Sequence, residues 1–396
     1  MLCMRQFKAK SPLHIKFVGP EASRPLSLFH PTSITNQYLP IQARQVHTHP
    51  HDQNKSSTIM ANQSIPSKMQ SYQYTASSGP IERTLTLANT AVPTASGSKI
   101  LIRTSATSLN PIDYKLADAP LISYLTRYFT TPGLDFSGHV VSGSSDLSLG
   151  TFVYGRLEPP AKYGALSPYL LIPRSGVAKL NSKVSAEEAA GLGTAAQTAY
   201  QSIVPFVQAG QTVFINGASG GTGVFAVQIA KILGCKVVAT CSGGNAQLVR
   251  DLGADEVVDY RTQDVLGVLK ARGEKVDHVV DAVGKSGALY FGAHHYLKEG
   301  GVYAQFGGGL TMADTKDMMG KFLWPAMFGG GRRAFKFIAC QNSTKDMEKI
   351  AEWFESGRLK VVVDSTYPYN QAPQAFEKLK TGRARGKVIV TAANRD

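Results

Sequence analysis

Cysteine is scarce in this sequence. The chain of 396 residues contains four cysteines, and of these only Cys235 and Cys241 lie near each other. Their spacing supports neither a disulfide framework nor a zinc-knuckle pattern, which is typical of proteins from a reducing compartment. Long apolar runs are also missing. None approaches the ~18 residues that a helix needs to cross a bilayer, so we predict no membrane span.

Acidic side chains are the second shortage. The sequence has 28 Asp and Glu against 42 Lys and Arg, giving a formal net charge of +14, and residues 1–70 hold eight basic but only two acidic side chains. A nucleic-acid-binding face would interleave its basic residues with aromatic ones. A solvated surface or an anionic cofactor explains the excess more simply, so we expect no nucleic-acid partner.

Residues 1–70 differ in composition from the rest of the chain. They are rich in Ser, Thr, Gln, His and Pro, and they show no sustained period of two or of 3.6 residues. A basic, serine-containing and acid-poor segment is typical of a mitochondrial transit peptide. The alternatives are a disordered extension, or translation that begins at Met60 or Met69. The expected location is therefore cytoplasmic or mitochondrial.

The remaining chain predicts an α/β fold with two kinds of module. Short alternating segments such as 99–109, separated by Gly and Pro, indicate a β-rich module in which 99–109 is a half-exposed strand. The spacing from Ser185 to Glu188 is that of a capping box and predicts the start of a helix. After Gly210, five strand-like segments alternate with mostly helical ones, which predicts a parallel, doubly wound sheet. Segments 360–367 and 387–392 again resemble strands of the first module, so the parallel sheet is predicted to be inserted into it.

Glycines gather where the first strand of the parallel sheet ends. The fingerprint is Gly217, Gly220 and Gly223, with an additional Gly221; it directly follows the apolar segment 212–216 and opens a helix. In this context the glycines allow a tight turn, close approach of the backbone to a pyrophosphate, and close packing of helix on strand. A glycine-rich turn without a ligand is the alternative. No Lys-Ser or Lys-Thr follows, which argues against a P-loop.

The second strand of this sheet indicates which dinucleotide would bind. A site that prefers NAD places an acidic residue at the end of this strand, where it accepts hydrogen bonds from the ribose. Here the strand ends at Ser242, and Asn245 follows. Both side chains can donate hydrogen bonds to a 2′-phosphate, and Tyr260 with Arg261 can complete the pocket. We therefore predict that the cofactor is NADPH.

The order of several motifs resembles the medium-chain dehydrogenase/reductase superfamily over nearly all of 70–396. The motifs are Asn110-Pro111-Ile112-Asp113, the segment Pro132–Gly138, Thr198-Ala199-Tyr200, the glycine fingerprint, LGADEVVDY at 252–260, and Gly386-Lys387. Within the superfamily the sequence looks like the quinone oxidoreductase branch. The resemblance implies a GroES-like catalytic domain at 71–195 and 341–396, a Rossmann domain at 196–340, and a homodimer. It also implies further cofactor-binding residues: Thr198, Ser219, Thr222, Val283, Gly284, Phe306, Gly307 and Lys387.

Zinc-dependent members of this superfamily bind their metal through residues that this sequence lacks. Gly133-Leu134-Asp135 stands at the position of their Gly-His-Glu, and Asn110-Pro111 stands where their first cysteine lies. Leucine cannot ligate a metal, and a catalytic zinc site needs about three protein ligands. We therefore expect a protein without zinc.

Hydride transfer from NADPH to an acceptor already polarised by conjugation requires no zinc. The predicted function is therefore a zinc-independent, NADPH-dependent oxidoreductase that acts on quinones or α,β-unsaturated carbonyls. The resemblance implies that 110–115 lies near the nicotinamide, which makes Asn110, Tyr114 and Lys115 the catalytic candidates. The alternative interpretation is that Asp113 is a loop or cap residue and that Tyr114 is a packing aromatic.

Two other functions stay open on the sequence alone. One is an enoyl reductase in fatty-acid or polyketide synthesis, and the other is a protein that binds NADPH without turnover. We expect the acceptor pocket to come from loops at 119–129 and 310–337. The second loop is rich in Met and aromatic residues, which suit an adaptable apolar wall but equally suit ordinary core or a dimer contact.

Overall fold

The computed structural model describes most of the chain after residue 64. The described residues are 65–74, 79–95, 97–118, 131–143, 146–159, 163–285, 287–309, 312–323 and 331–392. All of them belong to one compact unit, residues 52–396. Most of the predicted N-terminal extension and the predicted loop at 119–129 lie outside the described residues. Within the described part, no helix has the length and apolar character to cross a membrane.

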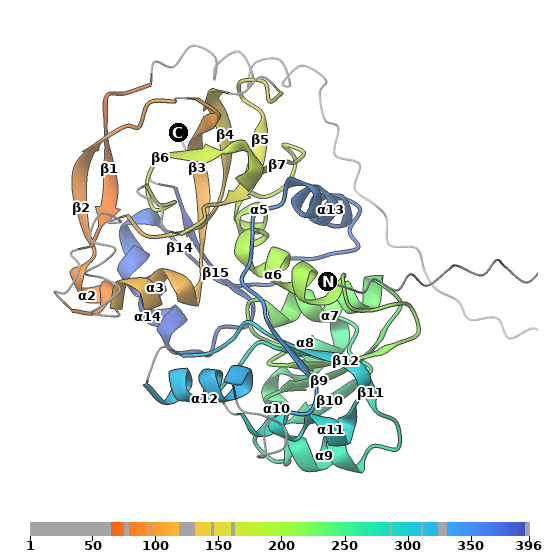
Figure 1. Ribbon diagram of the computed structural model, residues 1–396. Coiled ribbons are helices and arrows are strands. Elements are labelled where there is room, and N and C mark those ends of the chain that lie inside the picture. Colours follow the sequence, from red (N-terminus) through yellow and green to blue (C-terminus); the bar gives the residue numbers. More distant parts are fainter. Residues whose placement is uncertain are drawn as a thin grey trace, which may run out of the picture. The chain divides into compact units, whose positions relative to one another are not determined.

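The β-rich part is built on a seven-stranded mixed sheet (Figure 1). Its order is β14-β15-β3-β4-β5-β7, with β6 also paired to β3, and only β14 and β15 run parallel. The strands are β3 (Lys99–Leu109), β4 (Asp135–Ser142), β5 (Phe152–Arg156), β6 (Tyr169–Pro173), β7 (Val177–Lys179), β14 (Val363–Tyr367) and β15 (Lys387–Thr391). Strands β1 (Lys68–Gln73) and β2 (Thr86–Ala91) form a separate antiparallel pair.

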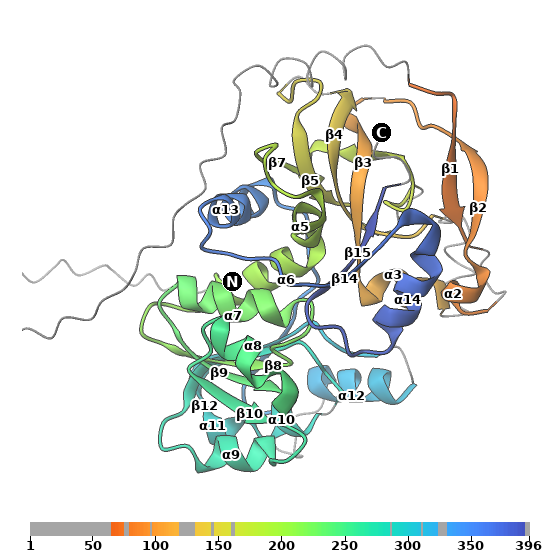
Figure 2. The ribbon, with the colours of Figure 1, turned by 180° about the vertical axis from the view of Figure 1, so that it is seen from behind.

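Short helices pack on or beside this mixed sheet. They are α2 (Ile81–Thr84), α3 (Pro111–Asp118), α5 (Ala186–Gly191) and α14 (Ala372–Lys380), with 3₁₀ turns at η1 (Arg174–Gly176) and η4 (Tyr369–Gln371). Helix α14 packs against β15 and beside α3 (Figure 2). The predicted helix start at Ser185 is confirmed, because the Ser185 hydroxyl accepts a hydrogen bond from the backbone N–H of Glu188. The carboxylate that contacts the Ser185 hydroxyl is that of Glu187, at 2.9 Å.

The second sheet has six strands, all parallel, in the order β10-β9-β8-β11-β12-β13. This is the strand order of the dinucleotide-binding doubly wound fold. The strands are β8 (Thr212–Asn216), β9 (Lys236–Cys241), β10 (Glu256–Asp259), β11 (Val276–Asp281), β12 (Leu297–Gln305) and β13 (Ala334–Phe337). The helices of this part and its borders are α6 (Gly193–Ile203), α7 (Gly223–Ile232), α8 (Ala246–Asp251), α9 (Val265–Ala271), α10 (Ala288–Phe291), α11 (Ala293–Tyr296), α12 (Met312–Leu323) and α13 (Thr344–Glu355), with η2 (Gly243–Asn245).

The sequence prediction of five strands and of a loop at 310–337 was wrong. This segment contains α12 and the sixth strand, β13. Three of the four β13 side chains are exposed, because β13 is the edge strand of the sheet. An exposed edge strand does not show the apolar pattern that marks a buried strand. The predicted half-exposure of 99–109 was also wrong, since β3 lies inside the mixed sheet and most of its side chains are buried.

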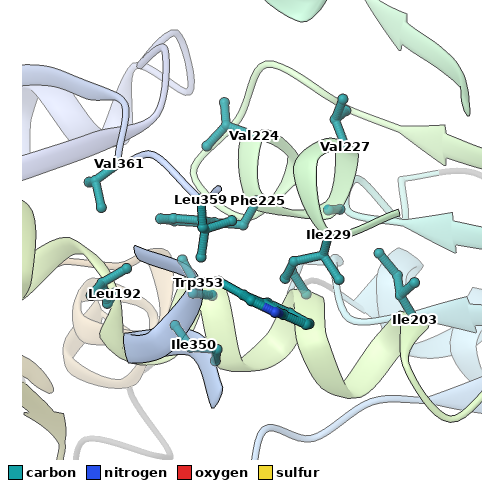
Figure 3. Packing of buried hydrophobic residues seen from close by; sticks show 14 of the residues in the cluster. Leu192, Ile203, Val224, Phe225, Val227, Ile229, Ile350, Trp353, Leu359 and Val361 are labelled. Atoms are coloured by element: carbon teal, nitrogen blue, oxygen red, sulfur yellow. The ribbon is translucent and has the colours of Figure 1, made fainter. Parts of the chain in front are cut away.

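One apolar cluster joins the two parts of the chain. Figure 3 shows Ile350 and Trp353 of α13 packed between side chains of α6 and α7, among them Ile203 and Ile229. The same cluster contains Tyr154 of β5 in the mixed sheet and Ile215 of β8 in the parallel sheet. Because the core is shared in this way, helices α6 and α13 pack on both parts and fix the site that lies between them.

Candidate functional site

The glycine loop, residues 217–223, connects β8 to α7. Gly217 has a φ of 86°, and a Cβ built on it would lie 2.7 Å from Cγ2 of Val283. A Cβ on Gly223 would overlap the carbonyl oxygen of Gly217. The protein itself therefore requires glycine at both positions, the first for the turn and the second for close packing of α7 on the strand.

The middle glycines of the loop differ from the outer ones. A Cβ on Gly220 would have its nearest neighbour at 3.5 Å, and one on Gly221 would lie 3.4 Å from the carbonyl oxygen of Gly386. These are ordinary contact distances, so neither the fold nor the local backbone requires the absence of a side chain there. Space left bare beside a helix N-terminus suits an anion that must approach the backbone closely.

Two further loops meet the glycine loop at the carboxyl ends of the strands. Val283 and Gly284 follow β11, and Phe306 and Gly307 follow β12. A Cβ on Gly284 would overlap the carbonyl oxygen of Gly307, so these two loops are in contact, while Val283 contacts Gly217. The predicted residues at this edge are therefore brought together, at the place where ligands bind in doubly wound sheets.

The residues predicted for the adenosine end also lie at this edge. Ser242 precedes η2, and the side-chain amide of Asn245 donates to the Ser219 hydroxyl at 3.0 Å. Tyr260 follows β10 and is 54% exposed. The sequence reasoning missed one neighbour, Asp259, whose Oδ2 would lie 2.6 Å from a Cβ on Gly243. An acid is thus present beside η2, although it comes from the third strand and not from the second.

A buried polar cluster occupies the end of β3 in the mixed sheet. Asn110 Oδ1 accepts from Lys387 Nζ at 2.6 Å, and Asn110 Nδ2 donates to Asp135 Oδ2 at 2.8 Å. The three residues, which we call the buried junction, are 5%, 2% and 0% exposed for Asn110, Lys387 and Asp135. The reversed amide would face ammonium with NH₂ and carboxylate with oxygen, so charge fixes the orientation of Asn110.

The Asp135 carboxylate makes four polar contacts, one of them to Asn110. Its Oδ1 accepts from the backbone N–H of Thr194 at 2.8 Å and from the Thr194 hydroxyl at 2.5 Å, and its Oδ2 lies 3.7 Å from Lys387 Nζ. Arg156 Nε donates to the same hydroxyl at 3.1 Å. Burial lowers the pKa of Lys387, and the charge of Asp135 opposes that shift. In the sequence Asp135 had no predicted role of its own; it was noted only as part of the segments 132–138 and 133–135.

The buried junction is connected to the glycine loop through the backbone. Gly386 precedes Lys387, and its N–H donates to the carbonyl oxygen of Ser219 at 3.1 Å. The predicted Gly-Lys pair therefore contacts both the loop expected to hold the pyrophosphate and the side chain of Asn110.

Asp113 has the capping role that the sequence left open. It lies in the first turn of α3, and its Oδ2 accepts from the backbone N–H of Asn110 at 2.7 Å. It is 6% exposed, and its Oδ1 has no hydrogen-bond partner among the described residues. Burial raises the pKa of Asp113 to about 7; the nearby charge of Asp135 adds to the shift and Lys387 opposes it.

Tyr114 and Lys115 point to different surroundings. The Tyr114 ring packs against an apolar cluster of the mixed sheet, with Lys380 Nζ 5.7 Å from the ring centroid. Lys115 Nζ donates to the carbonyl oxygen of Gly308, beside the 306–307 loop. Burial lowers the pKa of Lys115, while Asp314 opposes that shift. Lys115 therefore extends from α3 to the edge of the parallel sheet, whereas Tyr114 is surrounded by packing contacts.

The remaining predicted residues border this region. Thr198 lies in α6, is 5% exposed, and donates to the carbonyl oxygen of Thr194 at 2.6 Å. Thr222 is the residue before α7, and Phe306 packs against the shared apolar cluster. Leu134, at the position of a metal ligand in zinc enzymes, is 6% exposed within an apolar cluster.

Helix α12 brings a lysine that sequence reasoning did not single out. The ammonium group of Lys321 is buried, donates to Gln305 Oε1 at 2.9 Å and lies 2.6 Å from Asp317 Oδ2. Gln305 ends β12, next to Phe306. The only sequence signal was the i,i+4 spacing of Asp317 and Lys321, which is far more often a surface ion pair.

Comparisons with known proteins agree with this architecture. Residues 252–390 match the family described as zinc-binding dehydrogenase. The chain is 38% identical over 349 residues to a trans-enoyl reductase of Aspergillus terreus, covering 82% of this chain and 97% of that protein. It is 30% identical over 352 residues to an NADPH-dependent alkenal/one oxidoreductase of Arabidopsis thaliana, covering 84% of this chain and 82% of that protein.

Among solved structures, the quinone oxidoreductase from Coxiella burnetii matches with a TM-score of 0.71 and 26% identity, over 82% of this chain and 99% of that one. The predicted α/β fold and the predicted superfamily are therefore confirmed. The chain belongs to the medium-chain dehydrogenase/reductase superfamily, as one of its quinone-oxidoreductase-like enzymes.

Proposed function

We propose that this protein is an NADPH-dependent reductase that transfers hydride to a quinone or an α,β-unsaturated carbonyl compound without zinc. The observation that carries the proposal is the bare middle of the glycine loop, where Gly220 and Gly221 have no steric requirement from the protein. The trans-enoyl reductase and the alkenal/one oxidoreductase named above support the choice of acceptor, because both names denote the reduction of a conjugated double bond.

NADPH would be held along the carboxyl edge of the parallel sheet. The glycine loop with Ser219 and Thr222 would bind the pyrophosphate, and Ser242, Asn245 and Tyr260 the adenosine end. The nicotinamide end would lie along Thr198, Val283, Gly284, Phe306 and Gly307, with Lys387 beside it. When bound, NADPH supplies the hydride. Asp259 lies beside Gly243, so its negative charge would repel a 2′-phosphate bound there. A direct comparison of NADPH and NADH binding tests the preference.

Lys115 is the side chain that we propose as donor to the acceptor oxygen. Its ammonium group is at the edge of the site and bonded to a backbone carbonyl, so it can exchange that partner for an oxyanion. A pKa lowered by burial makes it a better proton donor than an exposed lysine. Both hydrogens of the Asn110 amide are directed at protein oxygens, those of Asp135 and Ser108. We therefore give Asn110 a positioning role and Tyr114 a packing role.

The absence of zinc is part of the proposal. At the expected metal position the side chain of Leu134 lies among apolar neighbours, and Asp135 is already engaged by Asn110, Thr194 and Lys387. Within the part of the chain that the structure describes, no group of three His, Cys, Asp or Glu side chains is arranged to hold a metal ion. The region that matches the zinc-binding dehydrogenase family, 252–390, contains neither position. Elemental analysis that found one zinc per chain would refute this part.

The function is tested by mixing the protein with NADPH and a panel of quinones, enones and enoyl thioesters while following the absorbance of the reduced nicotinamide. Turnover of enoyl thioesters alone would favour the second candidate, an enoyl reductase, which the similarity to the trans-enoyl reductase supports. NADPH binding without oxidation across the panel would favour a non-catalytic protein. Loss of turnover in Lys115→Ala with unchanged NADPH affinity is expected; unaltered turnover would exclude Lys115 as the donor.

We propose a homodimer, because Phe322, Leu323 and Phe337 on α12 and the edge strand β13 are 59%, 69% and 43% exposed. Light scattering at several protein concentrations tests the homodimer.

We propose a cytoplasmic or mitochondrial location, which is tested by imaging the full chain beside a chain that begins at Met60.

A further inference from the structure

Asp281 is a buried carboxylate at the edge of the parallel sheet where the cofactor loops meet. It is the last residue of β11 and is 1% exposed. Its Oδ1 accepts three hydrogen bonds, from Asn216 Nδ2 at 2.8 Å and from the backbone N–H groups of Val283 and Gly284, both at 2.9 Å. Its Oδ2 accepts from the Tyr303 hydroxyl at 2.7 Å.

The hydrogen bonds continue from Asp281 to the glycine loop. The hydroxyl of Thr240 donates to Asn216 Oδ1 at 2.7 Å and accepts from the backbone N–H of Gly217 at 2.9 Å. Asn216, Thr240, Asp281 and Tyr303 belong to the four adjacent strands β8, β9, β11 and β12. One carboxylate is therefore connected to the first residue of the glycine loop and to the loop after β11.

The charge of Asp281 needs an explanation, because burying a carboxylate is costly. The four donors to Asp281 are all neutral: one amide, one phenol and two backbone N–H groups. Hydrogen bonds to an ionised acceptor are about twice as strong as neutral ones. A carboxylate in this place holds the two backbone N–H groups more firmly than a neutral side chain would. The consequence is a fixed path for Val283 and Gly284, which contact Gly217 and Gly307.

We infer that Asp281 is a positioning residue for the dinucleotide: through its hydrogen bonds it holds the glycine loop and the 283–284 loop in the arrangement that binds the cofactor. The inference rests on the proposed binding of NADPH but not on the identity of the acceptor. It adds Asn216, Thr240 and Tyr303 as further members of the hydrogen-bonded network that holds these loops.

A matched control lies on the same strand. Asp277 is near the other end of β11, where it accepts from the backbone N–H of Thr212 at 2.9 Å and pairs with Lys298 at 2.7 Å. It thus connects β11 to β8 at the edge of the sheet away from the loops. Asp277→Asn removes a carboxylate from the same strand, β11, and weakens a contact to the same neighbouring strand, β8. It leaves the loops at the carboxyl ends of the strands unaltered.

The experiment measures NADPH affinity by fluorescence titration, together with the midpoint of urea unfolding, for the wild type, Asp281→Ala, Asp281→Asn and Asp277→Asn. We expect Asp281→Ala to bind NADPH at least about tenfold more weakly, the cost of losing hydrogen bonds to a charged group. Asp281→Asn retains an acceptor oxygen but not the charge, so it should recover about half of this loss in free energy and bind NADPH about threefold more weakly than the wild type. Asp277→Asn should bind NADPH as tightly as the wild type does, even if its urea-unfolding midpoint falls as far as that of Asp281→Ala.

Three results would overturn the inference. They are wild-type affinity in Asp281→Ala, equal weakening in Asp281→Ala and Asp277→Asn, and tighter binding in Asp281→Asn, which would show that the carboxylate acts mainly by repelling the cofactor. If Asp281→Ala does not fold, the comparison of Asp281→Asn with Asp277→Asn decides, with weakening expected in the former alone. A protein that binds NADPH in this pattern but reduces no acceptor would refute the proposed enzymatic function and support the positioning role. A wild type that does not bind NADPH refutes both.

Discussion

The stability of this protein should depend on the protonation of a single buried carboxyl group, that of Asp113. Burial raises its pKa from 3.8 to about 7. Between these values the folded protein holds a proton that the unfolded chain releases. The contribution of Asp113 to stability is therefore fully present below about pH 4 and is lost as the pH rises through about 7. Asp135, which adds to the shift, and Lys387 and Arg156, which oppose it, all belong to the surrounding cluster.

The size of the effect follows from the shift. About three pH units at 1.36 kcal/mol per unit give a loss of about 4 kcal/mol of unfolding free energy between pH 4 and pH 8. The substitution Asp113→Asn removes the titration but keeps an oxygen that can accept from the backbone N–H of Asn110, now 2.7 Å from Oδ2. The variant should therefore resemble the wild type at about pH 4 and become progressively more stable than it as the pH rises to 8.

Urea unfolding at several pH values measures this difference directly. Because both proteins share all other titratable groups, the difference between their unfolding free energies isolates Asp113. Parallel curves for the two proteins across this pH range would contradict the reasoning, and a variant that is less stable at pH 8 would show that the ionised carboxylate is the preferred form.

Two further predictions concern the glycine loop and a buried histidine. Gly220→Ala should weaken NADPH binding and leave the midpoint of thermal unfolding nearly unchanged. Gly223→Ala should also lose about 1–3 kcal/mol of stability, because its Cβ would overlap the carbonyl oxygen of Gly217. Thermal unfolding and NADPH titration of both variants check this, and equal unfolding midpoints would contradict it. Burial lowers the pKa of His278 to about 4, so the stability that His278 contributes is present above about pH 6.5 and falls by about 3 kcal/mol as the pH drops to 4. In urea unfolding, a His278→Gln variant should lack this pH dependence. An unchanged dependence in the variant would contradict the prediction.

The parts of the fold that sequence predicted well are those with a local signal. The segment 212–216 is an apolar run followed by glycines and a helical period, and the structure has β8 and α7 in these places. Ser185 was recognised because a cap depends on residues three positions apart. Strand β13 was missed for the opposite reason, since an edge strand with exposed side chains has no apolar pattern to recognise.

The polar interior of the mixed sheet was harder to predict. Thr104, Thr107 and Ser108 lie in the segment that was predicted to be half-exposed, yet they are 6%, 2% and 0% exposed. Neighbouring segments cover these side chains, and Thr107 donates to the carbonyl oxygen of Ala165 at 2.7 Å. Sequence alternation shows which side chains are polar, but not whether another segment covers them.

In the candidate site, too, the sequence predicted contiguous residues well and residues that are distant along the chain poorly. The glycine loop is contiguous and could be identified directly, whereas Asn110 and Lys387 of the buried junction are 277 positions apart. The resemblance to a known superfamily brought the Gly-Lys pair into consideration, but only the fold shows that it contacts Asn110 and Asp135. The side chains of the Asp281 network, Asn216, Thr240, Asp281 and Tyr303, are likewise spread over four strands, and no spacing rule connects them.

The position of β15 has a consequence for the order of folding. This strand lies between β14 and β3, and every strand of the parallel sheet lies between residues 212 and 337. As the chain is synthesised, all six strands of the parallel sheet are made before β15, the last strand to pair with β3. Long-range pairing of this kind is slow because a large loop must close first. Lys387 is the first residue of β15, so Asp135 meets its cation only when the mixed sheet closes, and the capacity for hydride transfer should be gained in the last step of folding.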